Sequence, residues 1–187
     1  MGEGWAQRSA ANTNCVEMVP TSIVCEHRLV VGLAELAVSN NPSAILTTYA
    51  LGSCLGVAIY DPVARVGGLL HAMLPDSRLD PAKAAAYPGM FVDTGLRALL
   101  EGACQMQADK RRLKLYATGG ARIMDEEDVF NIGGRNCAAL AEFIRKENLR
   151  LAAQQVGGHT NRTVYFSIGT GLVTLKVAGL PNEIVLC

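Results

Sequence analysis

Short, largely apolar runs of strand character recur along the chain, and in residues 113–118 apolar and polar residues alternate as in a half-buried β-strand. Turn-forming residues separate the runs, among them the Asn40-Asn41-Pro42-Ser43 tetrapeptide, the Asp61-Pro62 pair and several glycine pairs. The pattern predicts strands within residues 28–39, 44–50, 55–60, 66–70, 113–118, 149–156, 163–168 and 172–177.

Two segments have a different periodicity. Apolar residues recur at helical spacing in residues 89–107, from Val92 to Met106, and again in residues 135–147, where Cys137 and Leu140 lie on one stripe. Residues 76–88 contain two prolines and several charges, which predicts a loop or a short helix. Together, the predicted strands and helices indicate an α+β domain with two main helices on an antiparallel or mixed sheet.

The composition fits one globular domain. The chain has 187 residues, half of them hydrophobic, so we expect a single domain over residues 28–187, preceded by a flexible tail over residues 1–27. Seventeen basic residues balance seventeen acidic ones, and no basic block exceeds Lys110-Arg111-Arg112, which we interpret as a solvated helix exit. We therefore expect no nucleic-acid partner.

No run of about 20 consecutive apolar residues is present, and the first fourteen residues lack the apolar region of a signal peptide. We therefore expect a cytoplasmic protein without membrane insertion. The six cysteines are scattered and form no CxxC pair, so disulfides are not expected; Cys104 and Cys137 are interpreted as core residues. No metal site is expected, because Cys25 with His27, or Cys54 with His71, supplies only two ligands.

The candidate catalytic residues Cys54 and His71 lie in residues 51–75, LGSCLGVAIYDPVARVGGLLHAMLP. This stretch reads as a β-hairpin with a turn at Asp61-Pro62. A loop centred between Pro62 and Val63 would pair Tyr60 with Arg65 and place Cys54 directly opposite His71. A thiol and an imidazole in register on neighbouring strands suggest nucleophilic catalysis, because the imidazole can generate and stabilise the reactive thiolate.

Residues around this pair complete the candidate site. Glycines at positions 52 and 56 would let a substrate approach the backbone, and we expect the main chain at Gly52, Ser53 and Leu55 to bind substrate and oxyanion. The hydroxyl of Thr48 is placed to accept a hydrogen bond from the imidazole. A buried structural cysteine and a backbone-bound histidine are the alternative reading. A nucleophile elbow at GSCLG is disfavoured, because no helix follows the turn.

Several of these motifs resemble those of a known family, the CheD-type chemoreceptor glutamine deamidases of bacterial and archaeal chemotaxis. The resemblance covers residues 28–178 and rests on TTYALGSCLGVAIYDP, GGLLHAMLP, LYATGGA and NIGGRN, and above all on LGSC followed seventeen residues after the cysteine by the histidine of HxMLP. It implies a Cys54, His71 and Thr48 triad, the same three residues that the hairpin suggests.

The resemblance also implies a three-layer α/β/β sandwich similar to the catalytic domain of glutamine-deamidating toxins. It implies a thioester mechanism that converts receptor glutamines to glutamates without a cofactor. The expected substrate is the cytoplasmic helical domain of a methyl-accepting chemoreceptor, and a CheC-type phosphatase is an expected partner. Hydrolysis of receptor glutamyl methyl esters is a related activity.

Two other functions stay open at this stage. One is a chemotaxis module that regulates a CheC-type phosphatase without catalysis, and the other is a redox-responsive protein in which Cys54 is oxidised. The sequence differs from the usual family pattern at Gly134 of NIGGRN and in the segment GGHTNRTVYFSIGTG, residues 157–171. These differences leave the triad intact and concern the surface that would contact a receptor or a phosphatase.

Overall fold

The protein is described by a computed structural model over residues 27–122 and 130–186. The strands are β1 (His27–Val30), β2 (Leu36–Ser39), β3 (Ala44–Leu51), β4 (Leu55–Asp61), β5 (Val66–Ala72), β6 (Lys114–Gly119), β7 (Arg150–Val156), β8 (Arg162–Ser167), β9 (Val173–Val177) and β10 (Ile184–Leu186). The helices are α1 (Pro81–Ala86), α2 (Val92–Gln105) and α3 (Ile132–Glu147), with 3₁₀ turns η1 (Ser77–Leu79), η2 (Pro88–Met90) and η3 (Lys110–Arg112).

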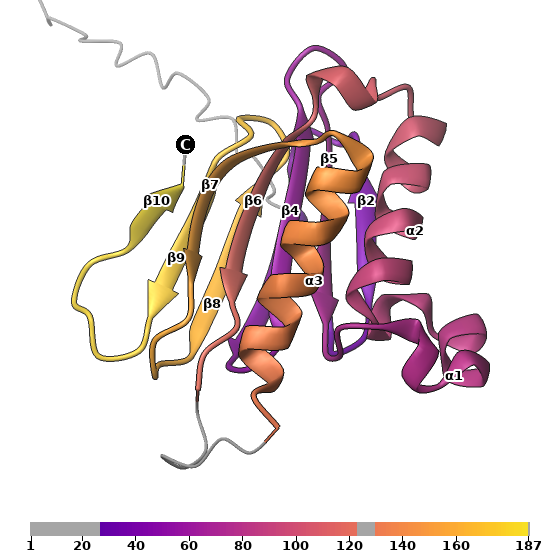
Figure 1. Ribbon diagram of the computed structural model, residues 1–187. Helices are drawn as coiled ribbons and strands as arrows, with labels where there is room; N and C mark the ends of the chain where they lie inside the picture. Colours follow the sequence, from indigo (N-terminus) through magenta and orange to yellow (C-terminus); the bar gives the residue numbers. More distant parts are fainter. Residues whose placement is uncertain (1–26, 123–129, 187) are drawn as a thin grey trace, which may run out of the picture.

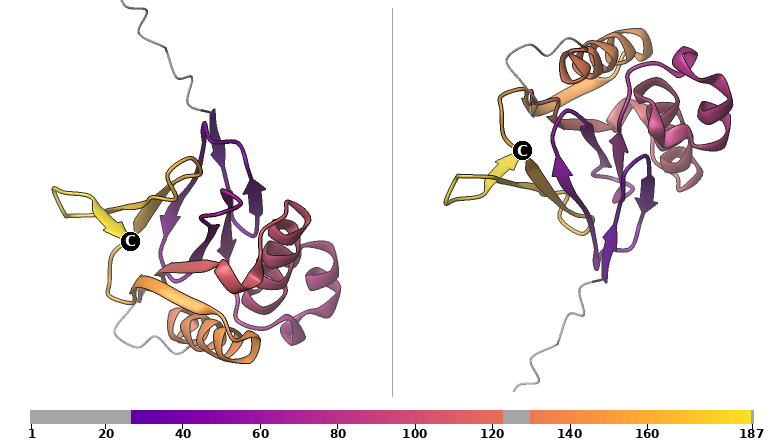
Figure 2. Two further views of the ribbon diagram at one scale, coloured as in Figure 1. Left: turned by 90° about the horizontal axis from the view of Figure 1, so that it is seen from above. Right: turned by 90° about the horizontal axis from the view of Figure 1, so that it is seen from below.

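The strands form two five-stranded sheets, with the orders β1-β3-β8-β9-β10 and β2-β5-β4-β6-β7. Helices α2 and α3 lie on one face of the second sheet (Figure 1), and the first sheet lies on its other face (Figure 2). One apolar core fills each of the two interfaces. Every residue of β4 and β5 is buried, because their sheet is the middle of three layers. The predicted α+β class is confirmed.

Small residues let the two sheets approach closely beside the hairpin. A Cβ atom on Gly67 of β5 would lie only 2.6 Å from Cδ1 of Ile168 and 2.7 Å from Cζ of Phe166, which belong to the first sheet's side of the core. No side chain fits between the sheets at this position. The close packing brings β3 of the first sheet within side-chain reach of β5 of the second.

The predicted register of the hairpin is wrong by two residues. His71 pairs with Gly56, not with Cys54, and Tyr60 pairs with Gly67, not with Arg65. The cause is Asp61, whose carboxylate accepts hydrogen bonds from the backbone N–H groups of the turn residues Val63 (2.9 Å) and Ala64 (3.2 Å). This arrangement keeps Asp61 in β4 and moves the turn to residues 62–65.

Most predicted elements are present, with three differences. The strand-like stretch 28–39 is divided between two sheets by a turn in which Ala34 has φ +62°. The short strand β10 was not predicted, and Cys104 is exposed rather than core, whereas Cys137 is half-buried. The described cysteines, Cys54, Cys104 and Cys137, are free thiols. The predicted tail lies outside the described residues except for His27, which begins β1.

Arg112 is not simply a solvated residue, because its guanidinium forms an ion pair with the fully buried carboxylate of Asp61 at 2.7 Å. Burial alone would raise the pKa of Asp61. Hydrogen bonds from Arg112 and from the backbone N–H groups of Asp109, Val63 and Ala64 outweigh burial and hold the pKa well below its usual range. The carboxylate thus ties the hairpin turn to the segment between α2 and β6.

Replacing Asp61 by asparagine is expected to lower the free energy of unfolding at pH 7 by roughly 2–4 kcal/mol, because the charge-assisted hydrogen bonds are lost in a buried site. A folded-state pKa below the unfolded one gives stability that is present above about pH 4 and is lost as the pH falls. Urea unfolding between about pH 2 and pH 7 should therefore show a steeper acid loss in the wild type than in D61N. Equal slopes would contradict the assignment.

Candidate functional site

The three residues predicted to form a triad come from different parts of the fold: Thr48 and His71 meet between the two sheets, and Cys54 packs against the core at that interface. Thr48 lies on β3 of the first sheet and His71 on β5 of the second. Cys54 lies in the short connection between β3 and β4, directly before Leu55. Thr48 is fully buried and His71 is 3% exposed, whereas Cys54 is only half-buried.

Hydrogen bonds fix the protonation pattern of the imidazole. The Thr48 hydroxyl lies 2.7 Å from the carbonyl oxygen of Val31 and 2.7 Å from Nδ1 of His71. A carbonyl only accepts, so the single hydroxyl proton of Thr48 goes to Val31, and the hydroxyl oxygen must accept from Nδ1–H. The other nitrogen, Nε2, then has a free lone pair, and it is buried without a protein hydrogen-bond partner among the described residues.

Cys54 lies diagonally across the hairpin from His71. Gly56 is the residue paired with His71, and Cys54 comes two residues earlier on the same chain. Diagonal neighbours of this kind have Cα atoms about 7–8 Å apart and long side chains that reach one another. Cys54 therefore lies two residues before the position opposite His71, not in the direct opposition that the sequence predicted.

Burial keeps both groups neutral in the resting state. It lowers the pKa of His71, and it raises the pKa of the Cys54 thiol, an effect that the cysteine's own backbone N–H partly offsets. A neutral imidazole with a free Nε2 is the form that accepts a proton. The site therefore matches a thiol that transfers its proton during attack better than a stored thiolate.

The loop that carries Cys54 is held through its carbonyl groups. Gly52 O accepts from the N–H of Ala121 and Cys54 O from the N–H of Gly120, both at 2.8 Å. Ser53 O accepts from the side chain of Asn136 at 3.0 Å. Fixed carbonyls fix the planes of the peptide units, and with them the directions of the N–H groups that an oxyanion needs.

The structure adds detail to what the sequence predicted for Gly56 and Leu55. A Cβ on Gly56 would lie 2.6 Å from Cδ1 of Leu51, so this glycine packs closely against a side chain of the first sheet. Leu55 is the first residue of β4, and its side chain is fully buried in the core. Only its backbone can contribute to an oxyanion site, whereas Gly52 and Ser53 remain in the loop.

Asn136 on α3 is the residue that the sequence reasoning missed. It is fully buried and donates hydrogen bonds to the main chain on both sides of the site. One signal was present: Asn136 lies four residues before Leu140, on the stripe of α3 that faces the core. A polar residue on an apolar stripe needs a partner, and here the partners are backbone carbonyls of the site.

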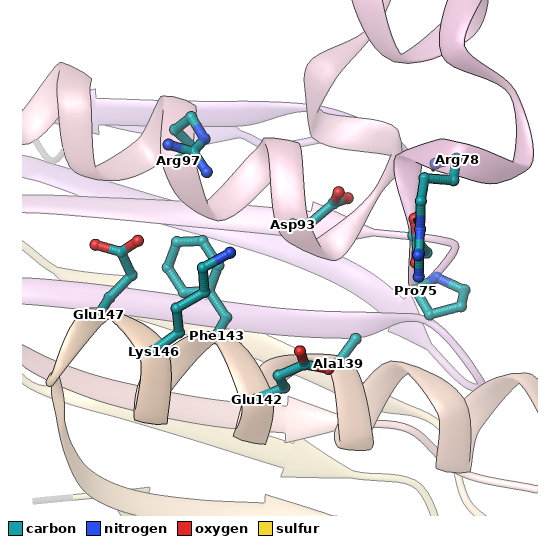
Figure 3. Close-up of a pocket in the computed structure, with 10 residues that line it drawn as sticks. Pro75, Arg78, Asp93, Arg97, Ala139, Glu142, Phe143, Lys146 and Glu147 are labelled. Carbon is teal, nitrogen blue, oxygen red and sulfur yellow. Dashed lines mark hydrogen bonds and ion pairs between the residues drawn. The ribbon is translucent and has the colours of Figure 1, made fainter.

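A hollow of about 350 Å³ lies between α2 and α3 (Figure 3). Its lining is largely charged, with Arg78, Arg97, Lys146, Asp93, Glu142 and Glu147 among its residues, and it does not include the triad. Within residues 27–122 and 130–186, no three His, Cys, Asp or Glu side chains form a metal site. The same ranges contain no helix of sufficient length and apolarity to span a bilayer.

Comparison with known proteins identifies relatives along most of the chain. Residues 73–177 match the family described as CheD chemotactic sensory transduction. A probable chemoreceptor glutamine deamidase CheD of Solibacter usitatus is 47% identical over 84% of this chain and 94% of its own length. The corresponding proteins of Syntrophus aciditrophicus and Pyrococcus horikoshii are 44% and 39% identical over 82% and 78% of this chain, and over 96% and 90% of their own lengths.

A solved structure, the Neisseria meningitidis protein NMB0706, covers 70% of this chain and is itself covered over 63% of its length, with 14% identity and a TM-score of 0.36. This similarity is too low to bear on function. The family match begins at residue 73, after Thr48, Cys54 and His71. Any role of these three residues is therefore a matter of their geometry in the fold.

Proposed function

Because the chain belongs to the CheD chemotactic sensory transduction family, we propose that it is a chemoreceptor glutamine deamidase with Cys54 as nucleophile and His71 as general base and acid. The substrate is an exposed glutamine on the cytoplasmic helical domain of a methyl-accepting receptor. The overall reaction consumes one water and releases one ammonia, leaving glutamate.

The first half-reaction forms a thioester. His71 Nε2 takes the proton of the Cys54 thiol as the sulfur attacks the carboxamide carbon, and the carbonyl π electrons move to the oxygen. The N–H groups of the loop, including that of Cys54, stabilise the resulting oxyanion. As the tetrahedral intermediate collapses, the C–N bond breaks and the imidazolium gives its proton to the departing ammonia.

The second half-reaction uses the same groups in reverse order. Nε2 takes a proton from a water molecule as the water oxygen attacks the thioester carbon. The C–S bond then breaks, the thiolate takes the proton back from the imidazolium, and the receptor side chain leaves as a carboxylic acid, which gives its remaining proton to water and becomes the carboxylate. Thr48 holds the ring through Nδ1–H in both halves, so Nε2 faces the reacting atoms throughout.

The observation that carries this proposal is the hydrogen-bond chain from His71 through Thr48 to Val31. A histidine that merely supported the fold would be expected to satisfy both ring nitrogens. Here one nitrogen is fixed as a donor, and the other is buried with an available lone pair beside a half-buried thiol. That arrangement supports acyl transfer over a regulatory module without catalysis.

Finer features belong to the same proposal. The thioester chemistry extends to receptor glutamyl methyl esters, whose leaving group is methanol in place of ammonia. The sandwich is proposed to resemble that of glutamine-deamidating toxins, with residues 28–187 as one deamidase domain. A CheC-type phosphatase is the proposed partner, and a receptor substrate of this kind places the protein in the cytoplasm.

The test is peptide mass mapping of a receptor cytoplasmic fragment incubated with the protein. Deamidation should add about one dalton at specific glutamines, and C54A should give no gain, because the thioester needs the sulfur. The matched control is C104A, which removes an exposed thiol away from the triad and should retain full activity. Continued deamidation by C54A, or no mass change with several receptors, would overturn the proposal.

A further inference from the structure

Asn136 reaches into the site from the helical layer. It is 0% exposed, and its Nδ2 group lies 3.0 Å from Ser53 O and 3.0 Å from Met73 O. Both acceptors are carbonyls, which cannot donate, so the orientation of the amide is determined: both protons of Nδ2 point to backbone oxygens. Few side chains supply two donors from one nitrogen in so small a volume.

The first of these hydrogen bonds controls a group that the chemistry uses. Ser53 C=O and Cys54 N–H belong to one planar peptide unit, so they point in opposite directions. Fixing the carbonyl toward α3 turns the N–H away from α3. The same residue, Cys54, carries the thiol that would attack a substrate carbonyl. Asn136 thereby sets the direction of the proposed oxyanion donor.

The second hydrogen bond reaches the segment that carries the base. Met73 lies two residues after His71, immediately beyond the end of β5. The single amide group of Asn136 therefore holds two segments: the loop that carries Cys54, and the residue that follows β5, the strand of His71. Because Cys54 and His71 are diagonal rather than opposed, no direct pair of ladder hydrogen bonds between these two residues sets their separation.

Glycine residues allow α3 to pack close enough to the sheet for Asn136 to reach the nucleophile loop. A Cβ atom on Gly133 would lie 2.5 Å from Gly120 O, so the first turn of α3 packs directly on the backbone after β6. Gly120 in turn donates its N–H to Cys54 O. The TGG and NIGG motifs thus bring the helix against the nucleophile loop, and Asn136 lies one turn further along the helix.

We propose that Asn136 is a positioning residue for the acyl-transfer reaction. It orients the Cys54 N–H toward the developing oxyanion and keeps the Cys54 loop aligned with the end of β5. This inference rests on the proposed function for its kinetic readout. The residue touches no reacting atom, and it acts through the peptide units at Ser53 and Met73.

The experiment compares N136L, which removes both donors at similar volume, with L140A, a matched variant. Leu140 is buried on the same face of α3 one turn along, and its truncation removes core packing without touching the site. Receptor deamidation is measured at a temperature where both variants are folded by circular dichroism. We expect kcat of N136L to fall about 10–30-fold with KM within about twofold, less than complete loss of an oxyanion donor.

A second readout does not depend on the receptor. The rate of Cys54 alkylation by iodoacetamide, followed by peptide mass, should fall about threefold in N136L at pH 7, because the thiol loses an oriented N–H that favours its ionised form.

In N136D a protonated carboxyl can donate one hydrogen bond. Its kcat relative to the wild type should therefore rise as the pH falls, whereas the relative kcat of N136L should not.

The outcomes separate this inference from the proposed function. Wild-type kcat and alkylation rates in N136L would overturn the inference alone, provided that C54A is inactive. An equal kcat loss in L140A would also overturn it, because the effect would then follow stability. Deamidation that survives in C54A would instead overturn the proposed function, and the alkylation rate would still decide whether Asn136 orients the loop.

Discussion

Replacing His71 by alanine is expected to reduce kcat/KM for receptor deamidation about a thousandfold or more. The imidazole takes the thiol proton, protonates the departing ammonia and activates water, and each such proton transfer contributes about a hundredfold to ten-thousandfold. Burial raises the pKa of Cys54, so few thiolates are present without the base. Single-turnover assays with the receptor fragment at sub-saturating enzyme concentrations would measure the loss of kcat/KM.

The pH profile identifies His71 as the group responsible. Activity needs the neutral imidazole, and burial lowers the pKa of His71, so the acid limb of the wild-type profile should have its midpoint below the ordinary histidine value of about 6.5. H71A should lose that limb over about pH 5–8, whereas C104A should keep it. A residual activity in H71A with the same acid limb would assign the titration to another group.

The sequence predicted the elements of this fold better than their pairing. Buried and more exposed positions alternate in β8 and β9, as in half-buried strands with a period of two. The predicted half-buried strand β6 is instead buried on both faces after Lys114, because its sheet is the middle layer. The sequence pattern did not separate β1 from β2, since both are strand-like and the turn between them contains Ala34 in a left-handed conformation. The partition into two sheets depends on contacts between distant segments, which a local pattern does not contain.

Thr48 and His71 are joined by a hydrogen bond, as the sequence predicted, whereas the predicted opposition of Cys54 and His71 is wrong. Thr48, Cys54 and His71 were each named, yet the register differed by two residues because the Asp61 carboxylate keeps its residue in the strand. Asn136 was missed because its partners, Ser53 and Met73, are 83 and 63 residues away along the chain. Hydrogen bonds of that range follow from packing of α3 on the sheet, which rests on Gly120 and Gly133.

Substitution of Thr48 is expected to give the second large loss of activity. Two variants distinguish the contribution of its hydroxyl group from that of its side-chain volume. T48V keeps the shape but leaves Val31 O and His71 Nδ1–H buried without their partner. We expect kcat to fall about a hundredfold and the free energy of unfolding by about 1–3 kcal/mol. T48S keeps the hydroxyl and should remain within about fivefold of the wild type, because the hydrogen-bond chain is preserved.

Nitrogen NMR of the imidazole gives a signature that loss of stability alone would not produce. The wild type and T48S should hold the Nδ1–H tautomer at neutral pH, since the hydroxyl that donates to Val31 accepts only from a protonated Nδ1. T48V should show a mixture of tautomers, and the Nδ1-deprotonated fraction presents no lone pair at Nε2 to the thiol. An unchanged tautomer with unchanged kcat would remove Thr48 from the mechanism. A loss as large as that of H71A would mean that its hydroxyl does more than orient the ring, for example by stabilising the imidazolium that forms during attack.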